Sequence, residues 1–297
     1  MKSNVRAALA AGACLLALCG CGGPEKKPAA AGAPQERRYP LTGEVVSVDA
    51  AKHTLRIQHE AVPDLMPGMT MDFAASAGDV AVVHPGERIR ADLVRDAKGE
   101  FHLEKIWPDD RTTDAVVAAG AQSLRQDTLI RGRSAYREVG EAVPDFALYD
   151  QTGKVVQSSR FQGRQIMLNF IYTRCPVATM CPAATLNMMA TQRLAREAGI
   201  KNVEFVSISF DPDDTPGMLR DYADARGIDT SNFTFLTGPE GAIKDLLTQF
   251  GVIAEFEGGV AKHTLATLLI DENGRIVHRA DGSGWEPKDF VAKMHRS

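Results

Sequence analysis

The sequence is poor in cysteine, has no excess of positive charge and, beyond its first residues, contains no long hydrophobic run. It has five cysteines in 297 residues and a formal net charge of −4. A chain without basic excess lacks the electrostatic footprint of a nucleic-acid-binding protein, so we expect no nucleic-acid partner. No apolar run after residue 21 reaches transmembrane length. The length predicts two domains.

The first 21 residues have the pattern of a secretory signal. Lys2 and Arg6 precede the apolar run "AALAAGACLLAL", which is too short to span a bilayer. The segment ends in "LCGC", which resembles the lipobox of bacterial lipoproteins. This resemblance implies that Cys21 becomes the acylated N-terminus, and that the protein is a periplasm-facing lipoprotein of the bacterial cell envelope. An ordinary signal with a chance cysteine is the alternative. Residues 22–38, rich in Pro, Ala and Gly, are typical of a tether.

Removal of the signal leaves two thiols, Cys175 and Cys181, in the stretch "IYTRCPVATMCP". In an oxidising compartment such a pair forms a disulfide or holds a metal. A domain of this size buries enough core to fold without a covalent staple. A disulfide that closes so short a loop would also stabilise the fold only slightly. The sequence therefore favours a functional role for the pair.

Residues 39–107 contain short alternating runs separated by turn residues. Such a pattern predicts an all-β domain, a small five-stranded barrel of the OB type. The five predicted strands are 42–49, 53–60, 69–75, 87–96 and 101–107.

One His and three Met gather in this predicted barrel. His59 shares a strand face with Leu55 and Ile57, and Met69 shares one with Met71. Met66 lies in the segment between the two strands. Thioether sulfur selects Cu(I), and an imidazole completes such a site. The alternative is that the methionines simply fill the core.

The segment "HEAVPDLMPGMTMDF" resembles the metal-binding segment of the CusF family of periplasmic copper-binding proteins. The resemblance implies that His59, Met69 and Met71 ligate Cu(I), beneath a Trp that covers the metal. This sequence has Met66 near the place of that Trp, which makes Met66 a candidate fourth ligand. We expect Trp107 to belong to the core instead. Residues 108–138 are predicted to be a linker, with a helix over 114–126.

Strands alternate with helical patterns over residues 139–297, as in an α/β thioredoxin-like fold. The apolar run "QIMLNFIY" (165–172) predicts a central strand covered on both faces. The two cysteines follow this strand and lead into a helix that starts near Pro182. Since helix N-termini favour anions, we expect the thiolate form of Cys181 to be favoured.

The spacing of the cysteines differs from that of a thioredoxin redox centre. Five residues separate Cys175 from Cys181, whereas a thioredoxin-type pair has two. Two thiols at this wider spacing are suited to share a metal ion, which requires a third ligand. We predict His263, because it follows a Gly-Gly loop and precedes a strand expected to border the cysteine strand. His278 and His295 are expected to lie at the surface.

The stretches "NFIYTRCPVATMCP", "SISFDPDDTP" and "KHTLATLLIDENGRIV" together resemble the Sco/SenC family of copper chaperones. The resemblance implies that Cys175, Cys181 and His263 bind copper as Cu(I) and Cu(II), with Asp211 close to the site. It also implies copper delivery to a respiratory protein such as the CuA centre of cytochrome c oxidase. The family spaces its cysteines by three residues, so the five found here predict weaker copper binding or more prominent thiol redox chemistry.

The main rival hypothesis is an enzyme. In a thiol–disulfide oxidoreductase, Cys175 and Cys181 would form a redox-active disulfide that keeps the cysteines of a copper-site client reduced. His263 would then only adjust a thiolate pKa. A peroxidase is less favoured. The predicted copper site in the barrel favours a metallochaperone over an enzyme, because a redox enzyme needs no such domain, but leaves the oxidoreductase as the alternative.

Overall fold

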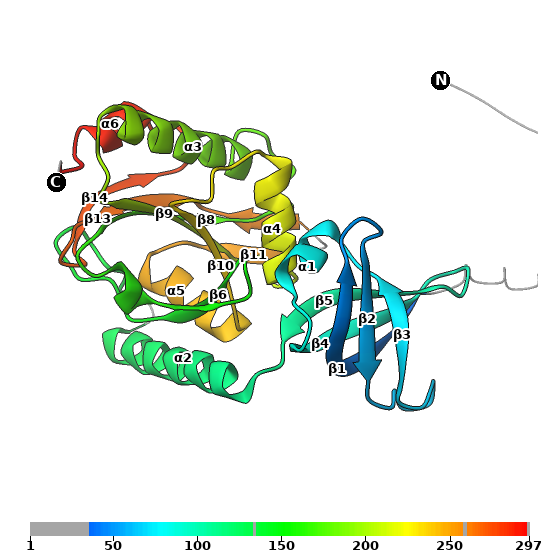
Figure 1. Ribbon diagram of the computed structural model, residues 1–297. Coiled ribbons are helices and arrows are strands. Elements are labelled where there is room, and N and C mark those ends of the chain that lie inside the picture. Colours follow the sequence, from blue (N-terminus) through cyan, green and yellow to red (C-terminus); the bar gives the residue numbers. More distant parts are fainter. Residues whose placement is uncertain (1–35, 133–134, 258–259, 296–297) are drawn as a thin grey trace, which may run out of the picture. The chain divides into compact units, whose positions relative to one another are not determined.

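The computed structural model describes residues 36–132, 135–257 and 260–295. It contains a barrel of five strands and a seven-stranded sheet with helices on both faces (Figure 1). Both predicted fold classes are therefore confirmed. No helix in the described part of the chain is long and apolar enough to cross a membrane.

The barrel forms because β1, β2 and β4 largely alternate between buried side chains that face its core and more exposed ones. Its strands follow the closed order β1-β2-β3-β5-β4, and the helix α1 (Ala77–Val82) connects β3 to β4. Between β3 and β5 the closure is a single parallel pair, Ala74 with His102. The strand bounds are β1 (Arg37–Asp49), β2 (Thr54–His59), β3 (Met69–Ala74), β4 (Arg88–Arg95) and β5 (Phe101–Pro108).

A long helix, α2 (Arg111–Arg131), follows the barrel and extends the predicted helix in both directions. The side chain of Asp110 caps its N-terminus by accepting a hydrogen bond from the backbone of Thr112. The helix packs against the C-terminal domain, where Leu124 joins the core. Trp107, expected in a core, is instead partly exposed and packs edge-on against Tyr149, with ring centroids 5.5 Å apart.

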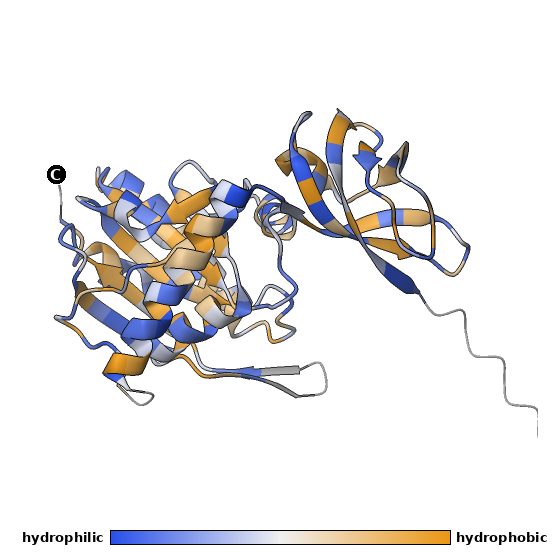
Figure 2. Ribbon diagram, turned by 90° about the horizontal axis from the view of Figure 1, so that it is seen from below, coloured by the Kyte–Doolittle hydropathy of each residue, from blue (hydrophilic) through white to orange (hydrophobic). Residues whose placement is uncertain are grey.

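The large sheet has the order β14-β13-β8-β9-β10-β6-β7. The strands β8, β9 and β10 are parallel, while β13 runs antiparallel to β8. Every residue of β8 is buried, as predicted for a central strand. Figure 2 shows the strands of this sheet as largely hydrophobic. The bounds are β6 (Ala147–Asp150), β7 (Val155–Gln157), β8 (Gln165–Ile171), β9 (Val203–Ser209), β10 (Phe233–Thr237), β13 (Ala266–Ile270) and β14 (Ile276–Asp281).

Helices cover both faces of this sheet. The helices α3 (Cys181–Glu197) and α6 (Pro287–Val291) lie on one face, and α2 and α5 (Glu240–Gln249) lie on the other (Figure 1). The helix α4 (Pro216–Ala225) contributes Leu219 and Tyr222 to the same core as α3. A separate hairpin, β11 (Ala254–Glu257) and β12 (Val260–His263), precedes β13. The Gly-Gly loop at its tip, residues 258–259, lies outside the described residues.

The helices α1 and α4 touch at two glycines. A Cβ atom on Gly78 would lie 2.0 Å from the carbonyl oxygen of Gly217, so neither helix tolerates a larger side chain here. The neighbouring Asp79 is buried in this contact. Burial, and secondarily the charge of Asp221, raise the pKa of Asp79 from its usual 3.8 to about 6.

The raised pKa of Asp79 predicts a pH-dependent stability. Between about pH 4 and pH 6 the folded protein keeps a proton that the unfolded chain releases, so the free energy of unfolding falls as the pH rises through this window. Asp79→Asn removes the buried charge and should raise the free energy of unfolding at pH 7.5, by on the order of 2–3 kcal/mol. Urea unfolding of both proteins measures this. At pH 4 the two should be nearly equal, and an equal gain at both pH values would contradict the prediction.

Candidate metal centre

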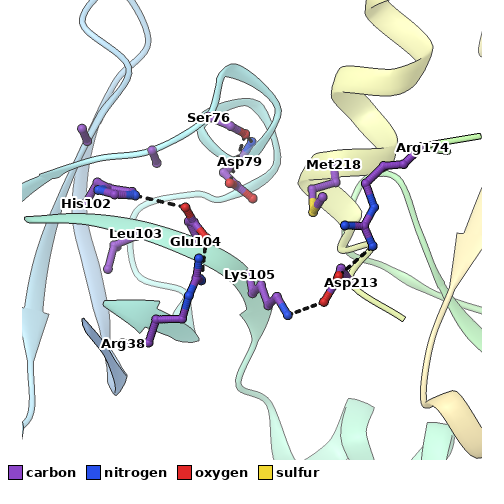
Figure 3. A pocket seen from close by; sticks show the side chains of 12 residues that line it. Arg38, Ser76, Asp79, His102, Leu103, Glu104, Lys105, Arg174, Asp213 and Met218 are labelled. Atoms are coloured by element: carbon purple, nitrogen blue, oxygen red, sulfur yellow. Dashed lines mark hydrogen bonds and ion pairs between the residues drawn. The ribbon is translucent and has the colours of Figure 1, made fainter. Parts of the chain in front are cut away.

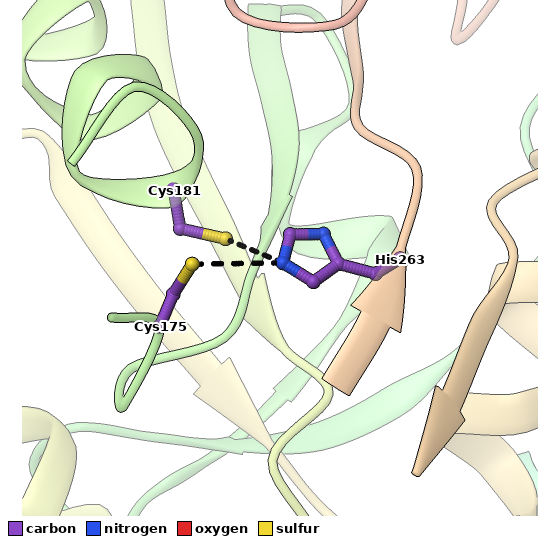
Figure 4. Close-up of side chains that lie close together, drawn as sticks. All are labelled: Cys175, Cys181 and His263. Atoms are coloured by element: carbon purple, nitrogen blue, oxygen red, sulfur yellow. Dashed lines mark hydrogen bonds between the residues drawn. The ribbon is translucent and has the colours of Figure 1, made fainter. Parts of the chain in front are cut away.

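Three side chains from separate segments converge at the C-terminal end of β8. Cys175 lies in the loop that follows β8, Cys181 is the first residue of α3, and His263 is the last residue of β12. His263 Nε2 lies 3.7 Å from Cys175 Sγ and 3.6 Å from Cys181 Sγ (Figure 4). The three ligand atoms lie within 4.8 Å of one another, and no other such group of His, Cys, Asp or Glu occurs among the described residues.

These separations fit a shared metal ion. Protein nitrogen and sulfur ligands sit about 2.0 and 2.3 Å from Zn²⁺, and similar bonds at trigonal angles would place them about 3.7 Å from each other. The observed separations of 3.6 and 3.7 Å match this value. The two thiols are free of a disulfide, which leaves both sulfurs available.

The imidazole of His263 is suited to bind as a neutral ligand. Its Nδ1 atom lies 3.3 Å from the backbone carbonyl oxygen of Thr264, which favours a proton on Nδ1 and a lone pair on Nε2. The ring packs edge-on against Phe210, with centroids 5.1 Å apart. Burial lowers the pKa of His263, so the neutral form is favoured near pH 7.

The pKa of the Cys181 thiol differs from the value expected for a cysteine at the start of a helix. Burial raises its pKa to about 12, although a hydrogen bond from the backbone N–H of Tyr172, at 3.3 Å, acts in the opposite direction. The prediction that the helix start favours its thiolate is therefore wrong for the metal-free protein. Desolvation outweighs the helix dipole because the side chain is almost fully buried. A metal that binds this sulfur must displace its proton.

Acidic side chains lie beside the loop that carries Cys175, residues 172–180, here called the cysteine loop. They are not part of the group formed by Cys175, Cys181 and His263. Arg174, directly before Cys175, donates from Nε to Asp211 Oδ2 at 2.6 Å and from Nη2 to Asp211 Oδ1 at 2.5 Å. Asp211 is buried and therefore acts on the loop through Arg174. Asp213 also accepts from Arg174, at 2.7 Å. Sequence reasoning missed Arg174 and Asp213, whose only signals were their positions beside Cys175 and Asp211.

The other histidines of this domain lie elsewhere. His278 packs edge-on against Phe290, with centroids 4.8 Å apart. His295 is an exposed residue that pairs with Glu272 at 3.7 Å. Neither belongs to the group formed by the two cysteines and His263.

The barrel brings several of its predicted ligands to one face. His59 pairs with Met69 across β2 and β3, and Ile57 pairs with Met71, so all four lie on the same side of the sheet. A bridge to Val62 holds the backbone of Met66 at the base of the connecting loop.

The burial of these side chains leaves one polar atom without a partner. His59 is 3% exposed, while Met69 is 48% exposed. The Nδ1 atom of His59 lies 2.7 Å from the backbone carbonyl oxygen of Glu60. Its Nε2 atom is buried and has no hydrogen-bond partner among the described residues. A buried lone pair beside thioether side chains is the arrangement that a soft metal ion would satisfy.

Comparison with known proteins assigns both domains. A family model described as SCO1/SenC matches residues 134–297, more than half of the chain. The chain belongs to the SCO1/SenC family. A second model, described as the copper binding periplasmic protein CusF, matches residues 38–108. Both resemblances are confirmed, and the expectation of copper holds at the level of these two families.

Individual relatives cover the Sco domain, which is the part of this chain from residue 134 onward. A SCO2-like protein of Rickettsia conorii is 31% identical over 157 residues, which covers 50% of this chain and 74% of that one. The solved structure of BsSco, described as a member of the Sco family of cytochrome c oxidase assembly proteins, is 26% identical and covers 53% and 93%, with a TM-score of 0.47. Copper-bound ScoI of Bradyrhizobium japonicum is 26% identical and covers 52% and 96%, with a TM-score of 0.41.

The two thiols should react at different rates in the metal-free, reduced protein. Cys175 is only partly buried, whereas Cys181 is buried and its pKa is raised to about 12. At pH 8 iodoacetamide should therefore modify Cys175 more than about tenfold faster than Cys181, because the thiolate is the reacting form. Mass spectrometry of peptides over a time course measures both rates. In denaturant the rates should become similar. Faster labelling of Cys181 in the folded protein would contradict the assignment.

Proposed function

We propose that this protein is a copper metallochaperone. Its Sco domain takes up one copper ion through Cys175, Cys181 and His263. The convergence of two sulfurs and one imidazole nitrogen within 4.8 Å is the observation that carries the proposal. Two thiolates and a neutral imidazole suit Cu(I), and Cu(II) accepts the same set with an added oxygen ligand.

The protonation states of the site make copper binding depend on pH. Since the pKa of Cys181 is raised, copper binding releases a proton from its sulfur. The lowered pKa of His263 removes competition from a proton on the imidazole near neutral pH. Copper affinity should therefore increase with pH mainly through the thiol of Cys181.

His263→Ala tests the ligand set in the full chain. Cu(II) affinity should fall by at least about tenfold, because Cu(II) depends on the imidazole. Cu(I) affinity should change by less than about threefold, since two thiolates hold Cu(I) without it. Competition with chelators in each oxidation state measures both. His295→Ala, at an exposed histidine of the same domain, is the matched control.

Two outcomes would contradict this assignment. Equal binding of both oxidation states by His263→Ala and wild type would remove His263 from the site. Turnover of a dithiol substrate by His263→Ala without copper would move the assignment to the thiol–disulfide oxidoreductase.

We propose a second copper site in the barrel, formed by His59, Met69 and Met71, with Met66 as a candidate fourth ligand. The unpartnered Nε2 atom of His59 and the shared face of the two methionines support it. Thioethers carry no charge and do not titrate, so this site would favour Cu(I) and need release no proton from its sulfur ligands.

A methionine substitution in the full chain tests the barrel site. The Cys175→Ser, Cys181→Ser variant should still bind one equivalent of Cu(I). Further substitution of Met69 and Met71 by Leu should abolish that binding while nearly conserving side-chain volume. Competition with a Cu(I) chelator counts the equivalents. Leu at Met189 and Met294, in the Sco domain, is the control. A Cys175→Ser, Cys181→Ser protein that binds no Cu(I) would overturn the barrel site.

The N-terminal signal and the family support a proposal for the location of the protein and for its copper recipient. We propose that acylated Cys21 anchors the chain to a membrane of the bacterial cell envelope, facing the periplasm; this segment lies outside the described residues. Sco proteins are associated with cytochrome c oxidase assembly. The proposed recipient is therefore a respiratory copper protein, such as the CuA centre of that oxidase. The barrel would supply a copper store or a transfer site on the same chain.

A further inference from the structure

A chain of charged side chains connects the barrel to the residue beside Cys175 (Figure 3). Lys105 Nζ, on β5 of the barrel, lies 2.5 Å from Asp213 Oδ1 in the Sco domain. The other oxygen of Asp213 accepts a hydrogen bond from Arg174 Nη2 at 2.7 Å. Arg174 in turn holds the buried Asp211 with two hydrogen bonds. The backbone of Arg174 leads directly into Cys175.

The backbone of β5 is bent so that Lys105 points out of the barrel. Leu103 and Ile106 are both buried in the barrel core, although residues three apart in a regular strand face opposite sides. The register between β4 and β5 shifts between Arg90 and Asp92, opposite this stretch. Lys105 has φ of 51°, in the left-handed region that lysine rarely adopts. This bulge keeps Ile106 inside and directs Lys105 toward Asp213, as bulges beside functional sites often do.

The contact between α1 and α4 holds the barrel where Lys105 can reach. Gly78 of α1 meets Gly217 of α4 with no room for a Cβ atom between them. Gly217 follows the segment 211–215, which contains both Asp211 and Asp213. The barrel is therefore packed against the start of the helix that follows the acidic segment.

The cysteine loop needs such support more at one end than at the other. Cys181 is fixed by the first turn of α3 and is buried. Cys175 is partly buried, and the residues 176–179 that follow it are exposed. The backbone N–H of Cys175 donates to the carbonyl oxygen of Tyr172 at 3.1 Å, so the position of Cys175 depends on the segment before it, which includes Arg174.

We propose that Lys105 is a positioning residue for the copper centre. Through Asp213 and Arg174 it holds the loop that carries Cys175, so the barrel supports the metal geometry of the Sco domain. This inference rests on the proposed copper site at Cys175, Cys181 and His263. The Lys105–Asp213 pair is partly exposed, and such pairs contribute little to global stability. Loss of Lys105 should therefore alter the copper site without unfolding the protein.

Lys105→Met in the full chain tests the role. Loaded with Cu(II), which thioethers bind poorly, the variant should show a shifted thiolate-to-Cu(II) absorption band and an altered EPR spectrum. Its Cu(II) affinity should fall by about threefold to tenfold. This is less than the loss expected when a residue that hydrogen-bonds a metal ligand directly is removed, because Lys105 acts through Asp213 and Arg174. Lys105→Arg keeps the charge and should restore the wild-type spectrum. Lys52→Met is the matched control, because Lys52 is an exposed barrel lysine that forms an ion pair with Asp49 of the same domain.

A metal-free readout separates this inference from the proposed function. Iodoacetamide should modify Cys175 about threefold faster in Lys105→Met than in Lys52→Met, because the loop is less restrained. A wild-type protein that binds no copper would overturn the proposed function, while this rate difference would still show the coupling. Identical spectra, affinities and alkylation rates for Lys105→Met and Lys52→Met would overturn the inference alone.

Gly78→Leu provides a second route to the same test. The larger side chain should separate α1 from α4 and withdraw Lys105 from Asp213. Its Cu(II) spectrum and its Cys175 alkylation rate should then change as in Lys105→Met. If the Cu(II) spectrum and the alkylation rate changed in Gly78→Leu but not in Lys105→Met, the contact between the domains would support the copper site without Lys105. Lys105 would then have no positioning role.

Discussion

The meeting of one imidazole nitrogen with two cysteine sulfurs depends on the pairing of β8 with β13. These strands run antiparallel, with Thr267 opposite Asn169 and Ile270 opposite Ile166. The start of β13 therefore lies beside the end of β8, and the residues before β13 meet the residues after β8. His263 ends the hairpin that precedes β13, and Cys175 follows β8. The register of this strand pair therefore sets which residues meet at the end of β8, and with it the position of the metal group.

Burial also determines the charge of the site before a metal binds. It raises the pKa of Cys181 and lowers that of His263, so both side chains favour their neutral forms near pH 7. With Cys181 and His263 neutral, the metal-free site buries no charge on these two side chains, and its three candidate ligand atoms already lie within 4.8 Å of one another. A metal ion must compete with a proton on sulfur, which links copper affinity to pH.

The candidate metal site in the barrel is built from a different set of donor atoms. Its candidate ligands are a buried imidazole with one unpartnered nitrogen and methionines on the same sheet face. Thioethers do not ionise and do not form disulfides, so disulfide formation would not remove these candidate donors. One chain thus carries two candidate donor sets of different softness and charge. The packing of α1 against α4 at Gly78 and Gly217 keeps the two domains in contact.

The sequence by itself determined the domain types and most of the ligand candidates. Alternating runs indicated the barrel, the apolar stretch of β8 indicated a central strand, and the two remaining thiols identified the site, because these signals are local. The partner of the cysteines also followed, since His263 precedes a strand whose neighbour in the fold was predictable. Two features were decided only by the tertiary structure. The pKa of Cys181 is raised because packing buries its sulfur, an effect that helix position alone does not reveal. Lys105 reaches Asp213 because a bulge in β5 turns its side chain outward and two glycines bring the domains together, and residues 108 positions apart in the chain give no local sign of such a contact.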